Sequence, residues 1–263
     1  MALKQHWDEK IRFEQQVDNS KSYVLPFIEQ TKKLTSGMQV MEVGCGEGGV
    51  LLPFIELGCY CIGVDLAPER IDIANNFLKN EVAENKALFL CQNIYDDSFY
   101  VKYAGTFDVI ILKDVIEHVH EQDKFIPYLK KLLKPEGQIF FGFPPWCMPF
   151  GGHQQLCRVK WISVLPYYHI LPKFIYKGIL KMAGEHPLII EDLMEIKDTR
   201  ISIERFERII KQSGLKILNK NHYLINPIYK YKFNIKPRLQ FPILTKIPFF
   251  RNFVTTCVYY TVG

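Results

Sequence analysis

Short apolar runs recur along the first half of the chain and alternate with segments of helical periodicity. The runs at 38–44, 59–66, 87–94, 107–114 and 138–144 have the length of buried strands. Strands that alternate with helices in this way are typical of βαβ units, in which a parallel sheet carries helices on both faces. Ligands of such sheets bind beyond the carboxyl ends of the strands, so we expect the candidate site among the residues that follow each run.

The segments between these runs carry residues that favour helix ends. Ser36-Gly37 and Gly58 are expected stops, and Pro68 suits the first turn of a helix. Helices are accordingly expected over 5–34, 46–58, 68–82 and 123–137.

The regular alternation breaks after Pro144. Residues 144–200 are rich in proline and aromatic residues, and we interpret them as a partly helical insert that covers the site. The pattern then predicts one more helix and two more strands, at 202–214, 215–225 and 252–262. The stretch between those strands, 226–251, is irregular and basic.

A glycine-rich loop follows the first expected strand. Gly44, Gly46 and Gly49 fit the spacing G-x-G-x-x-G, which lets the backbone turn sharply and approach a ligand closely. Free N–H groups at the start of the next helix would suit either a carboxylate or a pyrophosphate. The loop alone therefore leaves a nicotinamide-dependent oxidoreductase and other nucleotide-binding enzymes open.

Two acidic residues narrow this choice. Asp65 ends the second expected strand, 19 residues after Gly46, where a carboxylate binds a ribose in either cofactor class. Glu42 precedes the first glycine by two residues. A carboxylate there would repel a pyrophosphate but would suit a cationic amino-acid group. Glu42 therefore favours a cofactor that carries such a group over a dinucleotide.

The successive motifs VMEVGCGEGG, GVDLAPERIDIA, FDVIILKDVIEHV and LLKPEGQIFFGFP resemble those of class I S-adenosylmethionine-dependent methyltransferases. DVIEHV followed by LKPEG is similar to the group that contains the ubiquinone-biosynthesis O-methyltransferases. The resemblance implies an α/β Rossmann-like fold with a mostly parallel seven-stranded sheet, helices on both faces and an insert after the fifth strand. It also implies S-adenosyl-L-methionine as cofactor and S-adenosyl-L-homocysteine as product.

On this resemblance the chain is one domain, 1–263, in four parts. These are an N-terminal helical lid, a cofactor-binding core, a substrate-covering insert, and a C-terminal part with a helix, strands and a basic segment, at 1–36, 37–143, 144–200 and 201–263.

The same resemblance implies which residues hold the cofactor. Asp65 would accept hydrogen bonds from both ribose hydroxyls, and Asn93 would stand at the adenine edge, where many relatives carry aspartate. The methionyl end would meet the residues around the glycine loop and the end of the fourth strand. The full expected set is Tyr23, Glu42, Gly44, Cys45, Gly46, Asp65, Leu66, Asn93, Ile94, Leu112 and Lys113.

Histidines near the ends of the fourth and fifth strands are candidate catalytic bases. Methyl transfer to a hydroxyl benefits from a group that takes the proton, and His118 and His153 fall where such a base could stand. Asp114, Glu117 and His118 could also gather a divalent cation. We do not include a metal in the expected site.

Charge is distributed unevenly between the two parts of the chain. The net charge is +5, yet ten Lys/Arg and no Asp or Glu lie in 208–263, which leaves 23 basic and 28 acidic residues, a net of −5, in 1–207. Aromatic residues are interleaved with the basic ones, which favours contact with a membrane surface or an anionic, lipid-like molecule. No nucleic-acid-binding module is recognisable, and no nucleic-acid partner is expected.

The remaining features suggest an intracellular enzyme with a small acceptor. The seven cysteines show no metal spacing and suggest reduced thiols in a cytoplasmic protein, with membrane association as an extension of the basic segment. The resulting hypothesis is O-methylation of a small hydrophobic, aromatic or lipid-linked acceptor. An NAD(P)-dependent oxidoreductase and a non-catalytic binding protein with the same fold are the alternatives.

Overall fold

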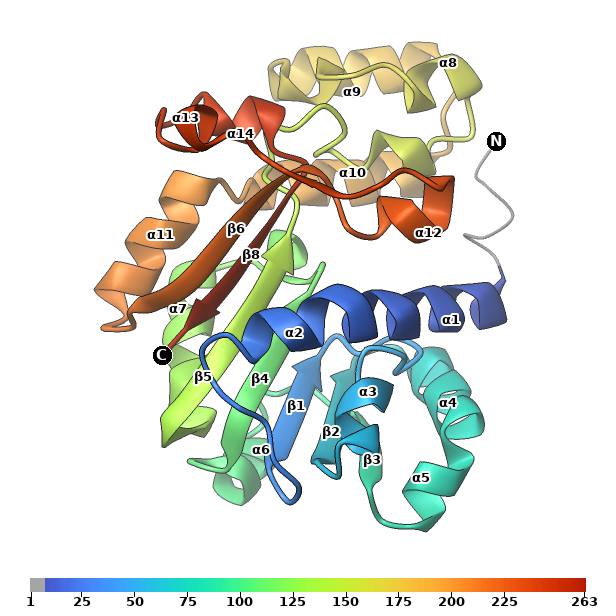
Figure 1. The fold of residues 1–263 in the computed structure, drawn as a ribbon. Helices are drawn as coiled ribbons and strands as arrows, with labels where there is room; N and C mark the ends of the chain where they lie inside the picture. The colour runs from blue at the N-terminus through green and yellow to red at the C-terminus, as the bar shows by residue number, and fades with distance from the viewer. Residues whose placement is uncertain (1–7) are drawn as a thin grey trace.

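One central sheet organises the computed structural model of the protein, which describes residues 8–263 (Figure 1). Its strand order is β3-β2-β1-β4-β5-β8-β6-β7. The first five strands of this order pair in parallel, whereas β8, β6 and β7 pair antiparallel. The strands are β1 (Gln39–Val43), β2 (Tyr60–Asp65), β3 (Ala87–Cys91), β4 (Phe107–Lys113), β5 (Leu133–Phe143), β6 (Ile217–Ile225), β7 (Arg238–Leu239) and β8 (Cys257–Val262).

The sheet confirms the predicted α/β, mostly parallel architecture and adds an eighth strand. That strand, β7, is only two residues long and lies at the edge beside β6. It is too short to show the alternation of polar and apolar residues that predicts a strand. The predicted strand at 252–262 begins later, at Cys257, because Arg251–Val254 form the short helix α14.

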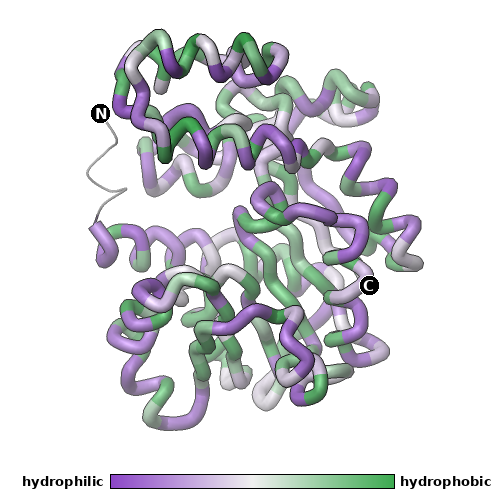
Figure 2. The backbone as a smooth tube through the Cα atoms, turned by 180° about the vertical axis from the view of Figure 1, so that it is seen from behind, coloured by the Kyte–Doolittle hydropathy of each residue, from purple (hydrophilic) through white to green (hydrophobic). Residues whose placement is uncertain are grey.

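Each buried strand contributes side chains to two hydrophobic cores, one on each face of the sheet. Along β4, Ile110 and Leu112 point into one core while Val109 and Ile111 point into the other. This is the alternation that a pleated strand imposes, and a strand covered on both faces must be apolar at every position. Figure 2 shows hydrophobic residues concentrated in the central strands.

Helices cover both faces, but several differ in extent from the expected ones. The N-terminal segment is helical from α1 to α2 through a π-helical turn, Ser20–Val24. The continuous helix predicted over 46–58 is wrong, because Gly46 and Gly48 adopt positive φ and the loop turns until Leu52. The helices of this layer are α1 (Glu9–Asn19), α2 (Leu25–Ile28), α3 (Leu52–Glu56), α4 (Pro68–Phe77), α5 (Lys79–Ala83), α6 (Asp97–Tyr103), α7 (Gln122–Leu132) and α11 (Ile203–Gln212).

The end of α7 also departs from the prediction. The helix stops at Leu132, and β5 already includes Pro135 and Gly137, which the sequence pattern placed at the end of the helix expected over 123–137. Proline is tolerated there because the first part of β5 pairs with β4 only at Leu133 before the register resumes at Gln138.

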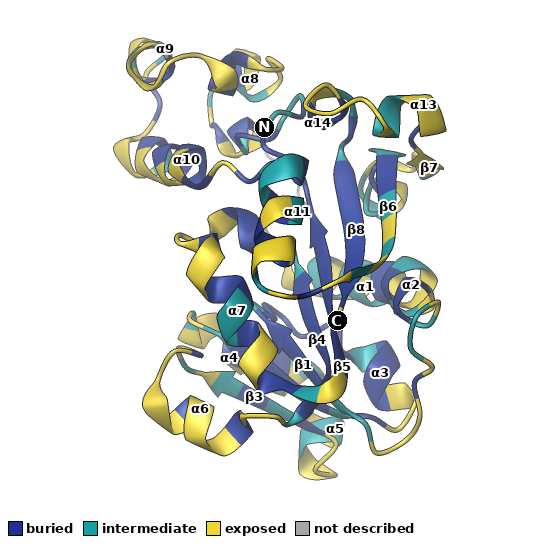
Figure 3. Cartoon of the chain, turned by 90° about the vertical axis from the view of Figure 1, so that its left-hand side faces the viewer, coloured by how far each residue is buried: buried dark blue, intermediate teal, exposed yellow. Residues whose placement is uncertain are grey.

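The 144–200 segment forms a separate helical layer with a small core of its own, which includes Ile162, Tyr176, Leu180 and Leu193. It lies beyond the carboxyl ends of the parallel strands (Figures 1 and 3). Its helices are α8 (Lys160–Ser163), α9 (Lys173–Met182) and α10 (Pro187–Thr199). Short helices α12 (Tyr229–Phe233) and α13 (Pro242–Thr245) occupy the stretch that was expected to be irregular.

Within residues 8–263, no helix combines the length and the apolar character that crossing a bilayer requires.

Candidate functional site

Two cavities meet at Gly44, at the carboxyl ends of the parallel strands. The larger has a volume of about 640 Å³ and lies toward β2 and the β3 end. The smaller has a volume of about 220 Å³ and lies under α1. Gly44 lines both, so the glycine loop divides one continuous region of the sheet edge into two chemically different halves. This is the place where ligands bind in sheets of this topology.

The loop conformation depends on glycine at Gly44. Its φ of +68° is one that residues with a side chain rarely adopt. A Cβ on this residue would lie 2.6 Å from Val115 Cγ2, closer than two carbon atoms can approach. The absence of a side chain at Gly44 therefore lets Val115 pack directly against the loop backbone, which lines both cavities.

Asp65 connects the end of β2 to the glycine loop. Its Oδ2 accepts a hydrogen bond from Gly46 N at 2.9 Å, and its Oδ1 accepts one from Ala67 N at 3.0 Å. The residue also lines the larger cavity. Because each carboxylate oxygen has two lone pairs, both oxygens can accept a further bond from a hydroxyl in the cavity.

The larger cavity has a mainly apolar lining around that carboxylate. Ile94 is buried, Leu66 is exposed at the rim, and the Phe125 ring closes the far wall. Asn93 lines the same cavity, but its Oδ1 accepts a hydrogen bond from Tyr95 N at 3.0 Å. Asn93 therefore acts as a turn residue, and a ligand would share its carbonyl oxygen with Tyr95.

Glu42 is the buried acid of the smaller cavity. It is only 2% exposed, and its Oε2 has no hydrogen-bond partner among the described residues. Burial raises the pKa of this carboxyl well above its ordinary value, although the positive charge of Lys113 opposes the rise. A cationic group that entered the cavity beside Glu42 would restore its carboxylate form. Cys45 lines the same cavity, and burial raises the pKa of its thiol, so it is not a nucleophile.

Glu47 contacts the part of α1 that borders the smaller cavity, a relationship that the sequence pattern did not reveal. Glu47 is fully buried and accepts hydrogen bonds from Arg12 Nε at 2.8 Å and Gln16 Nε2 at 2.9 Å. Burial alone would raise the pKa of this carboxyl, but the hydrogen bond and charge of Arg12 lower it overall. Gln16 Oε1 in turn accepts from Gly49 N at 3.2 Å. The first helix is thus fastened to the glycine loop by polar contacts.

Two expected residues do not present side chains to either cavity. Tyr23 packs against the core beneath α1, with Lys230 Nζ 5.9 Å from the centre of its ring. The Leu112 side chain is fully buried in the sheet, which leaves only its backbone for a ligand. Lys113 does line the smaller cavity and forms an ion pair with Asp114.

The remaining expected cofactor residues, together with others that the sequence analysis did not name, line the two cavities. Arg12, Gln15, Asn19, Arg70, Ile228 and Lys232 border the smaller one, and Gln92, Tyr95, Val119 and Lys124 border the larger one. Half of them come from α1, α4 and α12, and no local motif marks these, because only the fold brings the helices to the strand ends.

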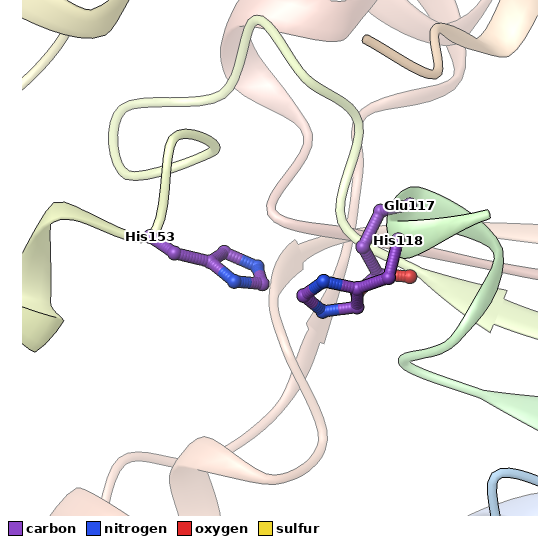
Figure 4. A group of neighbouring side chains, drawn as sticks. All are labelled: Glu117, His118 and His153. Atoms are coloured by element: carbon purple, nitrogen blue, oxygen red, sulfur yellow. The ribbon is translucent and has the colours of Figure 1, made fainter. Parts of the chain in front are cut away.

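The two predicted bases lie together. The ring centroids of His118 and His153 are 5.0 Å apart, and the rings face each other from the end of β4 and from the insert (Figure 4). Burial lowers the pKa of His118, and burial together with the neighbouring His118 lowers the pKa of His153 to about 4. Both imidazoles are therefore neutral at pH 7 and able to accept a proton. His118 also lines the larger cavity.

Glu117 completes this cluster. It is 4% exposed, and neither carboxylate oxygen has a hydrogen-bond partner within the part of the chain that the structure describes. Burial, reinforced by the negative charge of Asp114, raises its pKa well above the ordinary value. One ligand atom each from Glu117, His118 and His153 lies within 4.8 Å of the others, a spacing that could hold a metal ion. The trio considered from sequence contained Asp114 in place of His153.

Comparison with known proteins gives the same picture. A family described as a methyltransferase domain matches residues 16–162, more than half of the chain. The ubiquinone biosynthesis O-methyltransferase of Coxiella burnetii is 33% identical over 117 residues, 44% of this chain and 47% of that protein. The enzyme of the same name from Bartonella bacilliformis is 26% identical over 170 residues, 62% of each chain. The chain thus spans about half the length of the first of these curated relatives.

Solved structures share the fold at low sequence identity. Geranyl diphosphate C-methyltransferase of Streptomyces coelicolor superposes with a TM-score of 0.58 at 12% identity, covering 92% of this chain and 78% of that one. Phosphoethanolamine N-methyltransferase 2 of Haemonchus contortus gives 0.53 at 15% identity, covering 90% and 51%. With the profile match over 16–162 and the strand order of the sheet, these likenesses confirm the predicted family: the chain belongs to the methyltransferase domain family and has the class I fold.

Proposed function

We propose that this chain transfers a methyl group from S-adenosyl-L-methionine to an oxygen atom of a small hydrophobic acceptor. The observation that carries the proposal is the division of the strand-end region at Gly44, with Asp65 in one cavity and the buried, unsatisfied Glu42 in the other. A nucleoside and a charged amino acid joined through one sulfur atom match these two halves.

The larger cavity suits the adenosine part. Asp65 offers carboxylate lone pairs to the two ribose hydroxyls while it holds Gly46. The apolar surfaces of Leu66, Ile94 and Phe125 suit the flat faces of adenine. Neutral aromatic bases gain stability from such contacts without the burial of a charge.

The smaller cavity suits the methionine part, which carries one amino and one carboxylate group. Glu42 is an acidic partner for the amino group, and the basic side chains of Arg12, Arg70 and Lys113 border the same space. A pyrophosphate would lose water close to the buried Glu42, and three of the nearby cations already have acidic partners, Arg12 and Arg70 at Glu47 and Lys113 at Asp114. This is the physical reason to prefer the sulfonium cofactor over a nicotinamide dinucleotide.

When bound, S-adenosyl-L-methionine supplies an electrophilic methyl group and leaves as S-adenosyl-L-homocysteine. The chain has to place the acceptor oxygen in line with that methyl group, exclude water and receive the hydroxyl proton. The neutral His118 and His153 are the proposed proton acceptors, since both rings stand where the strand ends meet the insert.

The four predicted parts of the domain enter the proposal with these roles. The helix α1, tied to the loop through Arg12 and Glu47, is the lid over the cofactor, and the 144–200 insert covers the acceptor. Oxygen is the proposed acceptor atom because the curated relatives are named O-methyltransferases. A cytoplasmic location fits seven cysteines that form no disulfide.

Isothermal titration calorimetry with S-adenosyl-L-homocysteine tests the proposal. We expect saturable binding to the wild type that Asp65→Ala abolishes. Asp96→Ala is the matched control, since Asp96 is an acid at a strand-to-helix connection that lines neither cavity, and it should bind as the wild type does. Binding of NADH in place of S-adenosyl-L-homocysteine would contradict the proposal.

A further inference from the structure

Two segments without any acidic residue meet at one end of the molecule. Residues 137–184 contain five Lys/Arg and no Asp or Glu, and 208–263 contain ten Lys/Arg and again no acid. In the fold, α8 and α9 of the first segment lie at the same end as α13 and α14 of the second (Figures 1 and 3). Tyr167 Oη donates to the carbonyl of Phe253 at 3.0 Å, which joins the two segments directly.

Large apolar side chains project from this end into solvent. In the insert, Phe174 is 77% exposed and Met182 is 84% exposed, and in the C-terminal segment Ile243 and Phe249 are 73% and 72% exposed. A shallow groove of about 410 Å³ runs between them, lined by Tyr167, Ile170, Leu171, Pro172 and Phe253. We call these residues, with α9 and α13, the apical surface. Clustered exposed apolar groups of this size mark a surface that contacts something other than water.

The apolar and basic residues of α9 are arranged as in helices that lie in a membrane interface. Tyr176 and Leu180 face the core of the insert. Phe174 and Met182, eight residues apart and so on one face, are exposed instead, and Lys177 and Lys181 stand beside that stripe. A helix with apolar residues toward the acyl chains and lysines at its flanks binds anionic bilayers through both burial and charge.

Charge also determines which way the surface would face. Two acidic residues lie close to α9: Glu185, which follows the helix directly and is buried, and Asp198 on α10, which pairs with Lys173 at 2.6 Å. Lys177 and Lys181 belong to the outer layer. The C-terminal segment contributes fewer free charges than its composition suggests, because Arg251 is paired with Glu204 and Glu207. The insert is therefore as important as the basic segment expected from sequence.

We propose that the apical surface docks on an anionic lipid bilayer, with α9 lying in the interface and Phe174 and Met182 inserted among the acyl chains. Docking would place the insert, which carries His153, next to the membrane. Binding to a bilayer does not depend on methyl transfer, so this inference stands or falls apart from the proposed activity.

Sedimentation of the full chain with lipid vesicles tests the docking. We expect binding to phosphatidylcholine vesicles that contain about one third phosphatidylglycerol, and weak binding to pure phosphatidylcholine. The protein should be released as salt rises, because salt screens the attraction between the lysines and the anionic lipid. The double variant Lys177→Gln/Lys181→Gln should lower the affinity at least tenfold, at roughly fivefold for each lysine. Phe174→Ser/Met182→Ser should lower it by on the order of tenfold or more.

Matched controls come from the opposite end of the molecule. Val101 on α6 is 81% exposed, and Lys79 on α5 is exposed, so Val101→Ser and Lys79→Gln repeat the same chemical changes away from the apical surface. They should bind vesicles as the wild type does. All variants are at exposed positions, and unchanged far-ultraviolet circular dichroism will show that they are folded.

Three outcomes would overturn the proposal. The first is no sedimentation of the wild type with anionic vesicles at low salt, and the second is equal binding by the α9 variants and the controls. The third is a dimer, detected by light scattering without lipid, that the Phe174→Ser/Met182→Ser change dissolves, since the apical surface would then be occupied by a second copy of the chain.

Discussion

The backbone N–H of Gly46 donates a hydrogen bond to Asp65 Oδ2 at 2.9 Å, which fixes the end of β2 against the glycine loop. Asp65 Oδ1 accepts a second bond from Ala67 N. One carboxylate therefore holds two turns in place and also faces the larger cavity. Its structural and its ligand-binding roles can be separated by substitution.

Asp65→Asn is expected to destabilise the chain by about 1–3 kcal/mol, since an NH₂ donor would face a backbone N–H donor. The free energy of unfolding in urea measures this loss. Asp96→Asn is the control, because Asp96 makes no side-chain cap hydrogen bond to α6, and a change below about 0.5 kcal/mol is expected there. Equal losses at both positions would contradict the anchoring role of Asp65.

Gly44→Ala should separate steric crowding from the backbone cost of a positive φ. The new methyl group would lie 2.6 Å from Val115 Cγ2, in addition to the strain at φ +68°. Gly105 has φ +62° with nothing within 4 Å of its would-be Cβ, so Gly105→Ala carries the backbone cost alone, about 1 kcal/mol. We expect Gly44→Ala to lose about 1–3 kcal/mol more.

The double variant Gly44→Ala/Val115→Ala provides the internal check on that difference. Removing the Val115 methyl groups relieves the contact but not the φ strain, so its coupling to Gly44→Ala should recover most of the excess loss. Thermal and urea unfolding measure both terms. If Gly44→Ala and Gly105→Ala cost the same, the close packing of Gly44 on Val115 is not a determinant of stability.

The sheet and half of the site could be predicted because they depend on local patterns. Apolar runs buried on both faces mark the parallel strands, and Gly44 and Asp65 follow directly from strand ends. The prediction of a helix over 46–58 was wrong at its start. Gly46 and Gly48 suit a ligand-binding loop, and the positive φ that they adopt there is incompatible with a helix.

The rest of the site depends on contacts between distant segments. Arg12 meets Glu47 across 35 positions, and Lys232 reaches the smaller cavity from α12 near the other end of the chain. No local sequence pattern predicts these two contacts, because they form only when α1 and α12 pack on the ends of the strands. Tyr23 could not be placed from sequence for the same reason, since it lies in the π-helical turn Ser20–Val24 and packs against the core instead of lining either cavity.

His118→Asn and His153→Asn should each lower the rate of methyl transfer by about 10²-fold or more while leaving S-adenosyl-L-homocysteine affinity within about threefold. The two ring centroids lie 5.0 Å apart, and the proposed role of both imidazoles is to take the proton of the acceptor hydroxyl, so turnover should fall far more than the affinity for S-adenosyl-L-homocysteine. Formation of S-adenosyl-L-homocysteine with a panel of catechol, quinol and lipid-linked hydroxyl acceptors measures the rate.

His186→Asn is the control for those two substitutions. His186 caps α10 by accepting from Leu188 N at 3.3 Å, a bond that an asparagine side chain can also make, and it is remote from both cavities. Unchanged turnover is expected. A full rate in His118→Asn and His153→Asn would show that the acceptor loses its proton without help from this pair.

Acidification should weaken the insert through His169. This histidine is fully buried, with Nε2 2.8 Å from the carbonyl oxygen of Trp146, and burial, together with the charge of Lys197, lowers its pKa to about 4 even though that hydrogen bond opposes the shift. The unfolded chain, with an ordinary histidine pKa near 6.5, takes up the proton first. Stability is therefore complete above about pH 6.5 and falls as the pH drops toward 4.

The expected slope is up to about 1.4 kcal/mol for each pH unit within that window, and it levels off below pH 4, where both states are protonated. His222 has a pKa of about 4 as well and adds its own slope, so the difference between wild type and His169→Gln isolates the contribution of His169. Urea unfolding between pH 7 and pH 4.5 measures it. His169→Gln should cost a constant amount above pH 6.5 and lose stability less steeply below it. Parallel curves for the two proteins would mean that His169 has the same pKa in the folded and the unfolded chain, against the burial that surrounds it.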